Sequence, residues 1–100
     1  MNIDKIEVSE NNIYFVIYPK KKEVVINGET SIIEEEKINE LIRIVRTWNH
    51  EYYDSGYTDG NRFEVIIHYN GKEDVMRGVR GLPENYESFS SLVRSIYGRR

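Results

Sequence analysis

The sequence predicts an α+β domain: an antiparallel sheet of about five to six strands with two helices packed on one face. Three observations lead to this fold class. Short runs rich in β-branched and aromatic residues fill the first third, two later segments place apolar residues at helical spacing, and Asn-Gly pairs separate two pairs of strands. The chain has 100 residues, so we expect one domain, residues 1–100. The predicted order is strand–strand–strand–(strand)–helix–strand–strand–helix.

Three strands are expected before the first helix. Residues 3–8 form a short mixed strand, and residues 13–18 form a second strand that has no polar face. We therefore expect this second strand to be central and buried on both sides. Residues 23–26 form the third, and Asn27-Gly28 after it suits the positive φ angles of a type I′ turn.

The segment 29–33 leaves two alternatives open: a fourth strand, or a lead into the first helix. Ser31 and Glu34 have the spacing of a capping box, which favours a helix start. The helix is predicted from one apolar stripe, and it should end near residue 54. The stripe consists of Ile38, Leu41, Ile42, Val45, Trp48 and Tyr52.

A second hairpin and a second helix complete the predicted fold. Asn70-Gly71 turns a strand over residues 62–69 into one over residues 72–79, and the turn fixes the register. Phe63 should then lie opposite Gly78, and Glu64 opposite Arg77, Ile66 opposite Val75 and His68 opposite Glu73. The last helix should start at Pro83 or Asn85 and end at Gly98; its stripe is Tyr86, Phe89, Leu92, Val93, Ile96 and Tyr97.

Composition excludes several function classes. There is no cysteine, which rules out disulfides and thiolate metal sites. Seventeen acidic against fourteen basic residues give a net charge of −3, so we expect no direct nucleic-acid binding. The longest apolar run is too short to cross a bilayer, and we find no signal segment. We therefore expect a cytoplasmic protein without a membrane partner.

The residues carry little sign of catalysis. His50, Glu51 and Asp54 are one residue away from the H-E-x-x-H zinc-protease pattern, with Asp54 in place of the second histidine. A third ligand is still needed, and His68 is better explained by its pairing with Glu73. We expect no enzyme, catalytic residue, metal or cofactor. A small metal-dependent hydrolase using His50 and Asp54 and an accessory structural domain stay open as alternatives.

Binding is the better-supported function class, and four residues are the predicted partner site. Tyr53 lies off the apolar stripe, Tyr57 lies in a polar, glycine-flanked segment, and Arg80 lies past the paired part of its strand. Arg77 is nearby but already has Glu64 as a predicted partner. Tyrosine and arginine are enriched where interfaces derive most of their affinity.

The second half of the chain resembles a group of small uncharacterised α+β proteins of Gram-positive bacteria and their phages. The shared pattern is an aromatic helix end, a D-G before an alternating strand, a glycine turn, and P-x-N-[YF]-x-x-[FL]. Here it consists of Trp48, Tyr52-Tyr53, Asp59-Gly60, Phe63, Asn70-Gly71, Gly78 and Pro83 to Phe89. This chain departs from the shared pattern at two places. Phe63 replaces the more usual tryptophan, and residues 79–82 replace a more polar stretch.

The resemblance implies a fold and transfers no site. In size and composition the chain is also similar to anti-CRISPR inhibitors carried by phages. Together these features predict a non-catalytic protein-binding module, a phage-borne inhibitor of a bacterial defence nuclease. The expected partner is a CRISPR effector nuclease of the Cas9 type.

Overall fold

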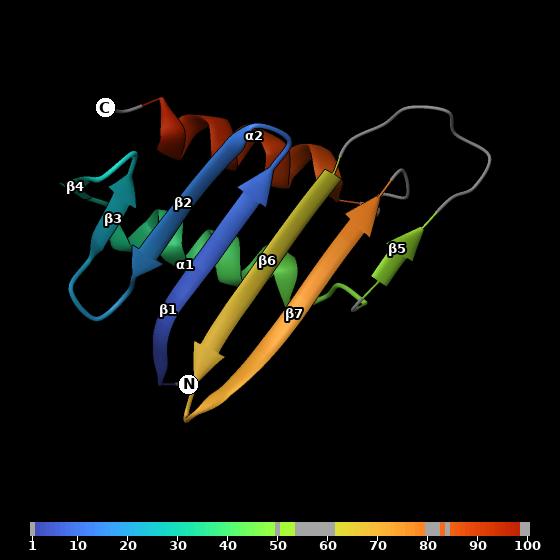
Figure 1. Cartoon of the computed structure of the whole chain (residues 1–100), viewed down its shortest axis with the longest axis horizontal. Coiled ribbons are helices and arrows are strands. Elements are labelled where there is room, and N and C mark those ends of the chain that lie inside the picture. Colours follow the sequence, from blue (N-terminus) through green and yellow to red (C-terminus); the bar gives the residue numbers. More distant parts are fainter. Residues whose placement is uncertain (1, 50, 54–61, 80–82, 84, 99–100) are drawn as a thin grey trace.

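The structure, a computed structural model, describes residues 2–49, 51–53, 62–79, 83 and 85–98. The described elements follow one another as β1 (Ile3–Glu10), β2 (Ile13–Tyr18), β3 (Glu23–Ile26), β4 (Glu29–Ile32), α1 (Glu35–Val45), β5 (Glu51–Tyr53), β6 (Arg62–Tyr69), β7 (Lys72–Val79) and α2 (Tyr86–Tyr97) (Figure 1).

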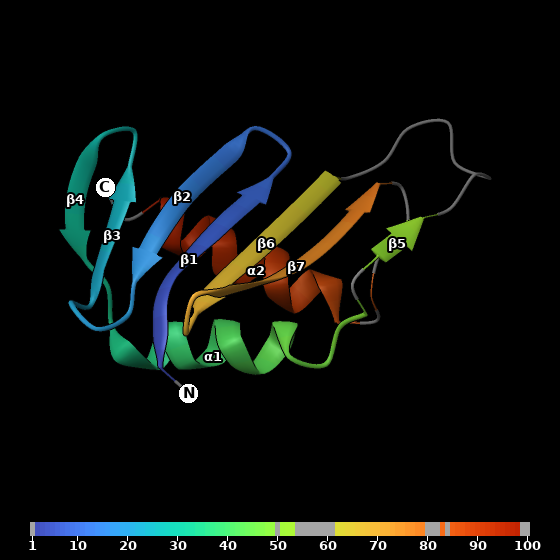
Figure 2. The same ribbon diagram turned by 60° about the horizontal axis from the view of Figure 1, so that its bottom comes forward.

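The strands form one sheet in the order β4-β3-β2-β1-β6-β7-β5, and both helices cover the same face (Figures 1 and 2). Neighbours from β4 to β7 pair antiparallel, and the short β5 runs parallel to β7. The predicted α+β class and the one-sided helix layer are confirmed. The seven strands in the described residues exceed the five to six expected, because β5 was assigned to a helix.

Both predicted Asn-Gly turns are present. Asn27 and Gly28 have φ angles of 51° and 81°, and Asn70 and Gly71 have φ angles of 49° and 74°. The left-handed backbone of these pairs matches the twist of the strands they join. The β6–β7 register is the predicted one at every position, including Phe63 opposite Gly78.

The segment before α1 is a strand, so the first of the two alternatives is correct. The turn at residues 27–28 places Ser31 opposite Val24 in the β3–β4 ladder. Ser31 is therefore held in extended backbone and forms no cap. Glu34 is the N-cap of α1 and makes no side-chain capping hydrogen bond.

The predicted extension of α1 to Tyr52 is wrong. The helix ends at Val45, the Thr47 hydroxyl donates to the Ile44 carbonyl at 2.9 Å, and residues 51–53 form β5. Trp48 keeps its predicted burial without being helical. At Tyr52, the last position of the stripe, sheet pairing with β7 thus outweighs the helical periodicity.

The core between the sheet and the helices has an aromatic centre near the start of β6. Trp48 meets Phe63 and Phe89 edge-on, with ring centroids 4.9 Å apart in both pairs, and Tyr86 packs on Phe63 at 5.5 Å. The Trp48 indole N–H donates to Asn85 Oδ1 at 2.6 Å, which links the end of α1 to the start of α2. These contacts explain the predicted stripe of α2, of which Tyr97 alone is only partly buried.

Candidate functional site

The face of the sheet opposite the helices, here called the open face, is uncovered by any described element (Figures 1 and 2). Side chains alternate along each strand, so the residues between the core positions point to this face. In β2 these are Tyr14, Val16 and Tyr18, because Phe15 and Ile17 are fully buried on the helix side.

A row across the middle of the open face carries two aliphatic pairs, with Glu7 between them. Val16 pairs with Val25 on one side and with Glu7 on the other, and Ile66 continues the row from Glu7 to Val75. The four aliphatic side chains are partly exposed. An antiparallel sheet with one solvated face normally carries polar residues there. Four aliphatic residues in one row are therefore an unusual feature of this face.

The exposure of β2 corrects a prediction. We expected the strand to be buried on both faces, but Tyr14 is 52% exposed and Val16 and Tyr18 are half-buried. The strand is central in the sheet order, yet both helices pack on the same side of it. The sequence of β2 is typical of a strand with both faces buried, but the described residues cover only one face of its sheet.

A polar cluster starts from Glu7 in this row and joins four strands. The Tyr14 hydroxyl donates to Glu7 Oε1 at 3.0 Å, and His68 Nε2 lies 2.5 Å from Glu7 Oε2. His68 Nδ1 lies 3.4 Å from Glu73 Oε2, which confirms the predicted His68–Glu73 pairing. Sequence reasoning missed Glu7 and Tyr14, because both reach His68 across strands distant in sequence.

The cluster shifts the acidity of two groups. The hydrogen bond from His68 lowers the pKa of Glu7 below its ordinary value, against an opposing effect of burial. Burial, followed by the hydrogen bond to Glu7, raises the pKa of Tyr14. Both ring nitrogens of His68 already face carboxylate oxygens, so this arrangement fixes side chains on the sheet and leaves no free imidazole nitrogen for chemistry.

A hollow of about 550 Å³ opens at the hairpin end of the open face, next to the polar cluster. Its wall includes Tyr18, His68, and two cations and two acids: Lys5, Lys72, Asp4 and Glu73. Asp4 is already paired with Lys20 at 3.1 Å. The mixed charge of this wall selects neither an anion nor a cation.

The four predicted partner-site residues have different outcomes. Arg77 lies on the open face, where its guanidinium is 4.0 Å from Glu64 Oε2 and its side chain is 59% exposed. The backbone of Tyr53 pairs with Val79, so β5 lies directly beside the strand of Arg77. Tyr57 and Arg80 lie outside the described residues. The structure therefore brings Tyr53 and Arg77 onto neighbouring strands.

The zinc-like pattern was based on a helix that reaches Asp54, whereas α1 ends at Val45. His50 and Asp54 lie outside the described residues, but residues 51–53 between them form a strand. Positions four residues apart are neighbours on a helix, whereas in a strand they are separated by about 13 Å, too far to share one metal ion. In the described part of the chain, no group of three or more histidine, cysteine, aspartate or glutamate residues is placed to hold a metal ion.

Comparison with protein families, curated proteins and solved structures gives no match. Among the described helices, none has the length and apolar character needed to span a membrane.

Proposed function

We propose that this protein is a non-catalytic protein-binding module that contacts its partner through the open face. The observation that supports it most strongly is β2. Its sequence is apolar on both sides, one side packs on the helices, and the other presents Tyr14, Val16 and Tyr18. A partner that covers this side would give the strand the double burial that its sequence favours.

The residue types on this face support a protein partner. Tyrosine and arginine, here Tyr14, Tyr18 and Arg77, are typical anchors of protein interfaces. A standard interface buries about 800 Å² on each partner, which requires a broad surface such as the face of a sheet. Tyr53, Tyr57 and Arg80 stay predicted contact residues, and the backbone of Tyr53 belongs to β5, which borders the strand of Arg77.

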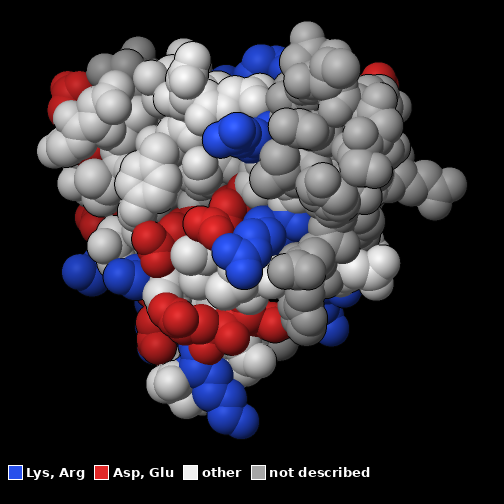
Figure 3. All heavy atoms as spheres, turned by 45° about the vertical axis from the view of Figure 1, so that its right-hand side comes forward, with Lys and Arg blue, Asp and Glu red and all other residues white. Residues whose placement is uncertain are grey.

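The charges on this side disfavour nucleic acid. Glu7, Glu64 and Glu73 all point to the open face, since they pair there with Val16, Arg77 and His68. Figure 3 looks obliquely onto this face and shows acidic side chains gathered on it, with basic side chains among them. Phosphate backbones bind to clustered cations, so this surface is suited to a protein.

The partner class that we propose is a bacterial defence nuclease, with a CRISPR effector nuclease as the first candidate. This part of the proposal rests on size, composition and the resemblance of the second half of the chain. The proposed binding surface does not depend on the identity of the partner, so the role of the open face can be tested first.

The test compares capture of bacterial proteins on wild-type domain and on two matched variants. Val16→Lys with Ile66→Lys adds two charges to the open face; Ser88→Lys with Ser91→Lys adds the same two charges to exposed positions of α2. We expect the open-face variant to lose at least about tenfold in affinity, or ~1.4 kcal/mol, while the α2 variant binds as wild type. Circular dichroism checks that both stay folded.

Two further variants locate the edge of the contact. Tyr53→Ala with Tyr57→Ala should also lose about tenfold in affinity. Lys20, Lys21 and Lys22 form an exposed basic run in the turn after β2, and changing all three to Ser should leave binding normal. If wild-type domain retains no protein at micromolar concentration, the binding-module proposal is wrong. A lysine-dependent, strongly salt-sensitive interaction would instead indicate nucleic acid.

A further inference from the structure

The solvent side of α1 has its charges separated along the helix. Glu36 and Glu40 lie in its first half, and Arg43 and Arg46 lie at its end; all four are exposed. Residues three, four and seven apart lie on the same side of a helix, so Glu36, Glu40 and Arg43 form one line along the outer surface. The helix dipole favours this order of charges within one chain.

These four charged side chains have no partner in the part of the chain that the structure describes. The other acid of the first turn, Glu35, pairs with Lys22 at 3.5 Å, and Lys37 donates to Ser95 on α2. By contrast, no hydrogen bond or ion pair within the described residues engages Glu36, Glu40, Arg43 or Arg46 through its side chain. Glu40 and Arg43 are three residues apart and still do not pair.

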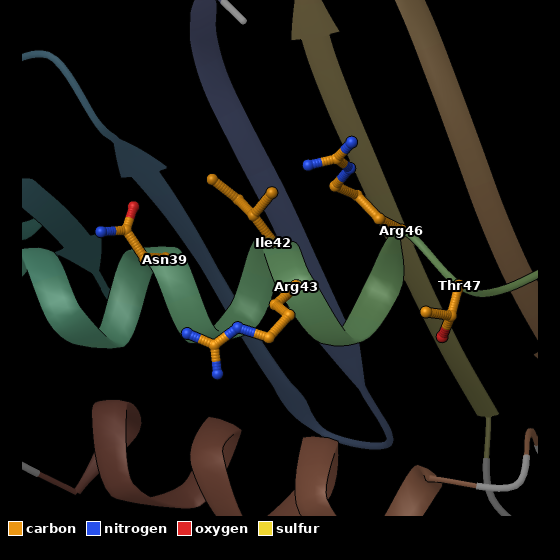
Figure 4. Close-up of a pocket in the computed structure, with 5 residues that line it drawn as sticks. All are labelled: Asn39, Ile42, Arg43, Arg46 and Thr47. Carbon is orange, nitrogen blue, oxygen red and sulfur yellow. The ribbon is translucent and has the colours of Figure 1, made fainter.

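The arginine end of the line borders a hollow of about 550 Å³, lined by Asn39, Ile42, Arg43, Arg46 and Thr47. In Figure 4, Asn39, Ile42 and Arg46 point to one side of the helix, and Arg43 points to the other, toward α2 in this view. Arg43 and Arg46 are three residues apart and both exposed, so both start from the solvent side of α1, and their guanidinium groups diverge to the two flanks of that side. Ile42, which is only partly buried, lies on the same side as Arg46 and adds an apolar side chain there.

We propose that α1 is a self-association surface on which a second copy of this chain packs its own α1 antiparallel. The pattern is self-complementary: antiparallel alignment about a two-fold axis near residue 41 places Glu36 against Arg46 of the other copy, and Glu40 against its Arg43. Each contact occurs twice, as a two-fold interface requires. A parallel alignment would place acid against acid.

The resulting dimer is weak and sensitive to salt. An eleven-residue helix is about 16 Å long, so the contact is smaller than a standard stable interface. Ion pairs between exposed charges are screened by salt. We expect a dissociation constant of about 0.1–1 mM at low ionic strength. The surface lies on the helix side, so both open faces of the dimer stay accessible.

The experiment is analytical ultracentrifugation of the full chain, from about 20 μM to about 1 mM, at low salt and at about 0.5 M salt. Two charge-reversed proteins are compared: Glu36→Arg with Glu40→Arg, and Arg43→Glu with Arg46→Glu. We expect wild type to dimerise at low salt, each reversed protein to be at least tenfold weaker, and an equimolar mixture of the two to recover dimerisation. Val16→Lys with Ile66→Lys, which adds two charges to the opposite side of the sheet, should dimerise as wild type.

Monomeric wild type at the highest concentration and low salt would overturn the proposal. So would dimerisation of both reversed proteins alone, or failure of their mixture to associate when circular dichroism shows both folded. If a reversed protein does not fold, Arg43→Gln with Arg46→Gln replaces it and should weaken the dimer at least threefold. Binding of a poly-glutamate peptide by a wild-type protein that stays monomeric would assign the surface to acidic partners and contradict the dimer.

Discussion

The two faces of the sheet are built from the same strands but stabilised differently. The helix side is closed by aliphatic and aromatic side chains and includes a buried polar contact between Glu10 and Tyr86. The open face has a partly exposed aliphatic row and the cluster around His68. The difference indicates that the covered face carries the stability of the domain, whereas the open face is the surface that we propose for a partner.

The largest effect should come from the aromatic centre of the covered face. Phe89 is fully buried and contacts Trp48, Phe63 and Tyr86. Phe89→Ala should cost about 4 kcal/mol of unfolding free energy, since it removes buried area and leaves a cavity. Chemical denaturation measures this. A loss below about 1 kcal/mol would show that the covered face is not the main source of stability.

The buried polar contact should give the next largest effect. The Tyr86 hydroxyl donates to Glu10 Oε2 at 2.5 Å, and Glu10 is only 3% exposed. Burial and then this hydrogen bond raise the pKa of Tyr86 well above its ordinary value. Tyr86→Phe leaves the carboxylate without this donor and should cost about 2 kcal/mol.

The same contact predicts a dependence on alkaline pH. Because the folded pKa of Tyr86 lies above the unfolded one, its contribution is complete below the unfolded value of about 10 and is lost as pH rises beyond it. Wild type should therefore lose more stability than Tyr86→Phe above that pH. Equal losses in the two proteins would contradict the role of this hydrogen bond.

Substitution of two adjacent valines in β3 allows the two faces of the sheet to be compared within one strand. Val24 points to the helices and is 3% exposed, whereas Val25 points to the open face and is partly exposed. Threonine has the shape of valine and favours strands, but its hydroxyl needs a hydrogen bond when buried. Val24→Thr should cost about 1.5 kcal/mol and Val25→Thr below about 0.5 kcal/mol. Equal losses of unfolding free energy in the two variants would mean that Val25 is as buried as Val24, which would contradict the exposure of the open face.

The smallest stability effect should come from the polar cluster, at acid pH. His68 lowers the folded pKa of Glu7, so the contribution of Glu7 is present above its unfolded pKa of about 4.3 and is lost as pH falls through the folded value. Wild type should lose stability more steeply than Glu7→Gln below about pH 4.5. The measurement is urea denaturation of both proteins over a range of pH. Parallel plots of unfolding free energy against pH would show that the cluster contributes nothing to stability.

The fold was largely predictable because its signals are local. Asn-Gly pairs fix turn geometry, and a two-residue turn then fixes the register, so the pairing of Glu64 with Arg77 and of His68 with Glu73 followed from residues 62–79 alone. The stripe of α2 is equally local. Such features depend on residues a few positions apart.

The misassigned parts depend on contacts between distant segments. The helical spacing of Trp48 and Tyr52 indicated a longer helix, but pairing with β7, some 25 residues later, makes residues 51–53 a strand. The open face could not be recognised because a strand that is apolar on both sides does not reveal which side its own chain covers. Glu7 joins His68 only once β1 pairs with β6.

The most direct test of the open face follows valine methyl resonances while the captured partner is titrated into the labelled domain, with a soluble paramagnetic agent present. Val16, Val25 and Val75 lie on the open face; Val8, Val24 and Val65 lie on the covered face. We predict that the first three are broadened by the agent in the free domain and become protected in the complex, while the other three are protected throughout. Open-face methyl groups that stay accessible in a saturated complex would contradict the proposed binding mode.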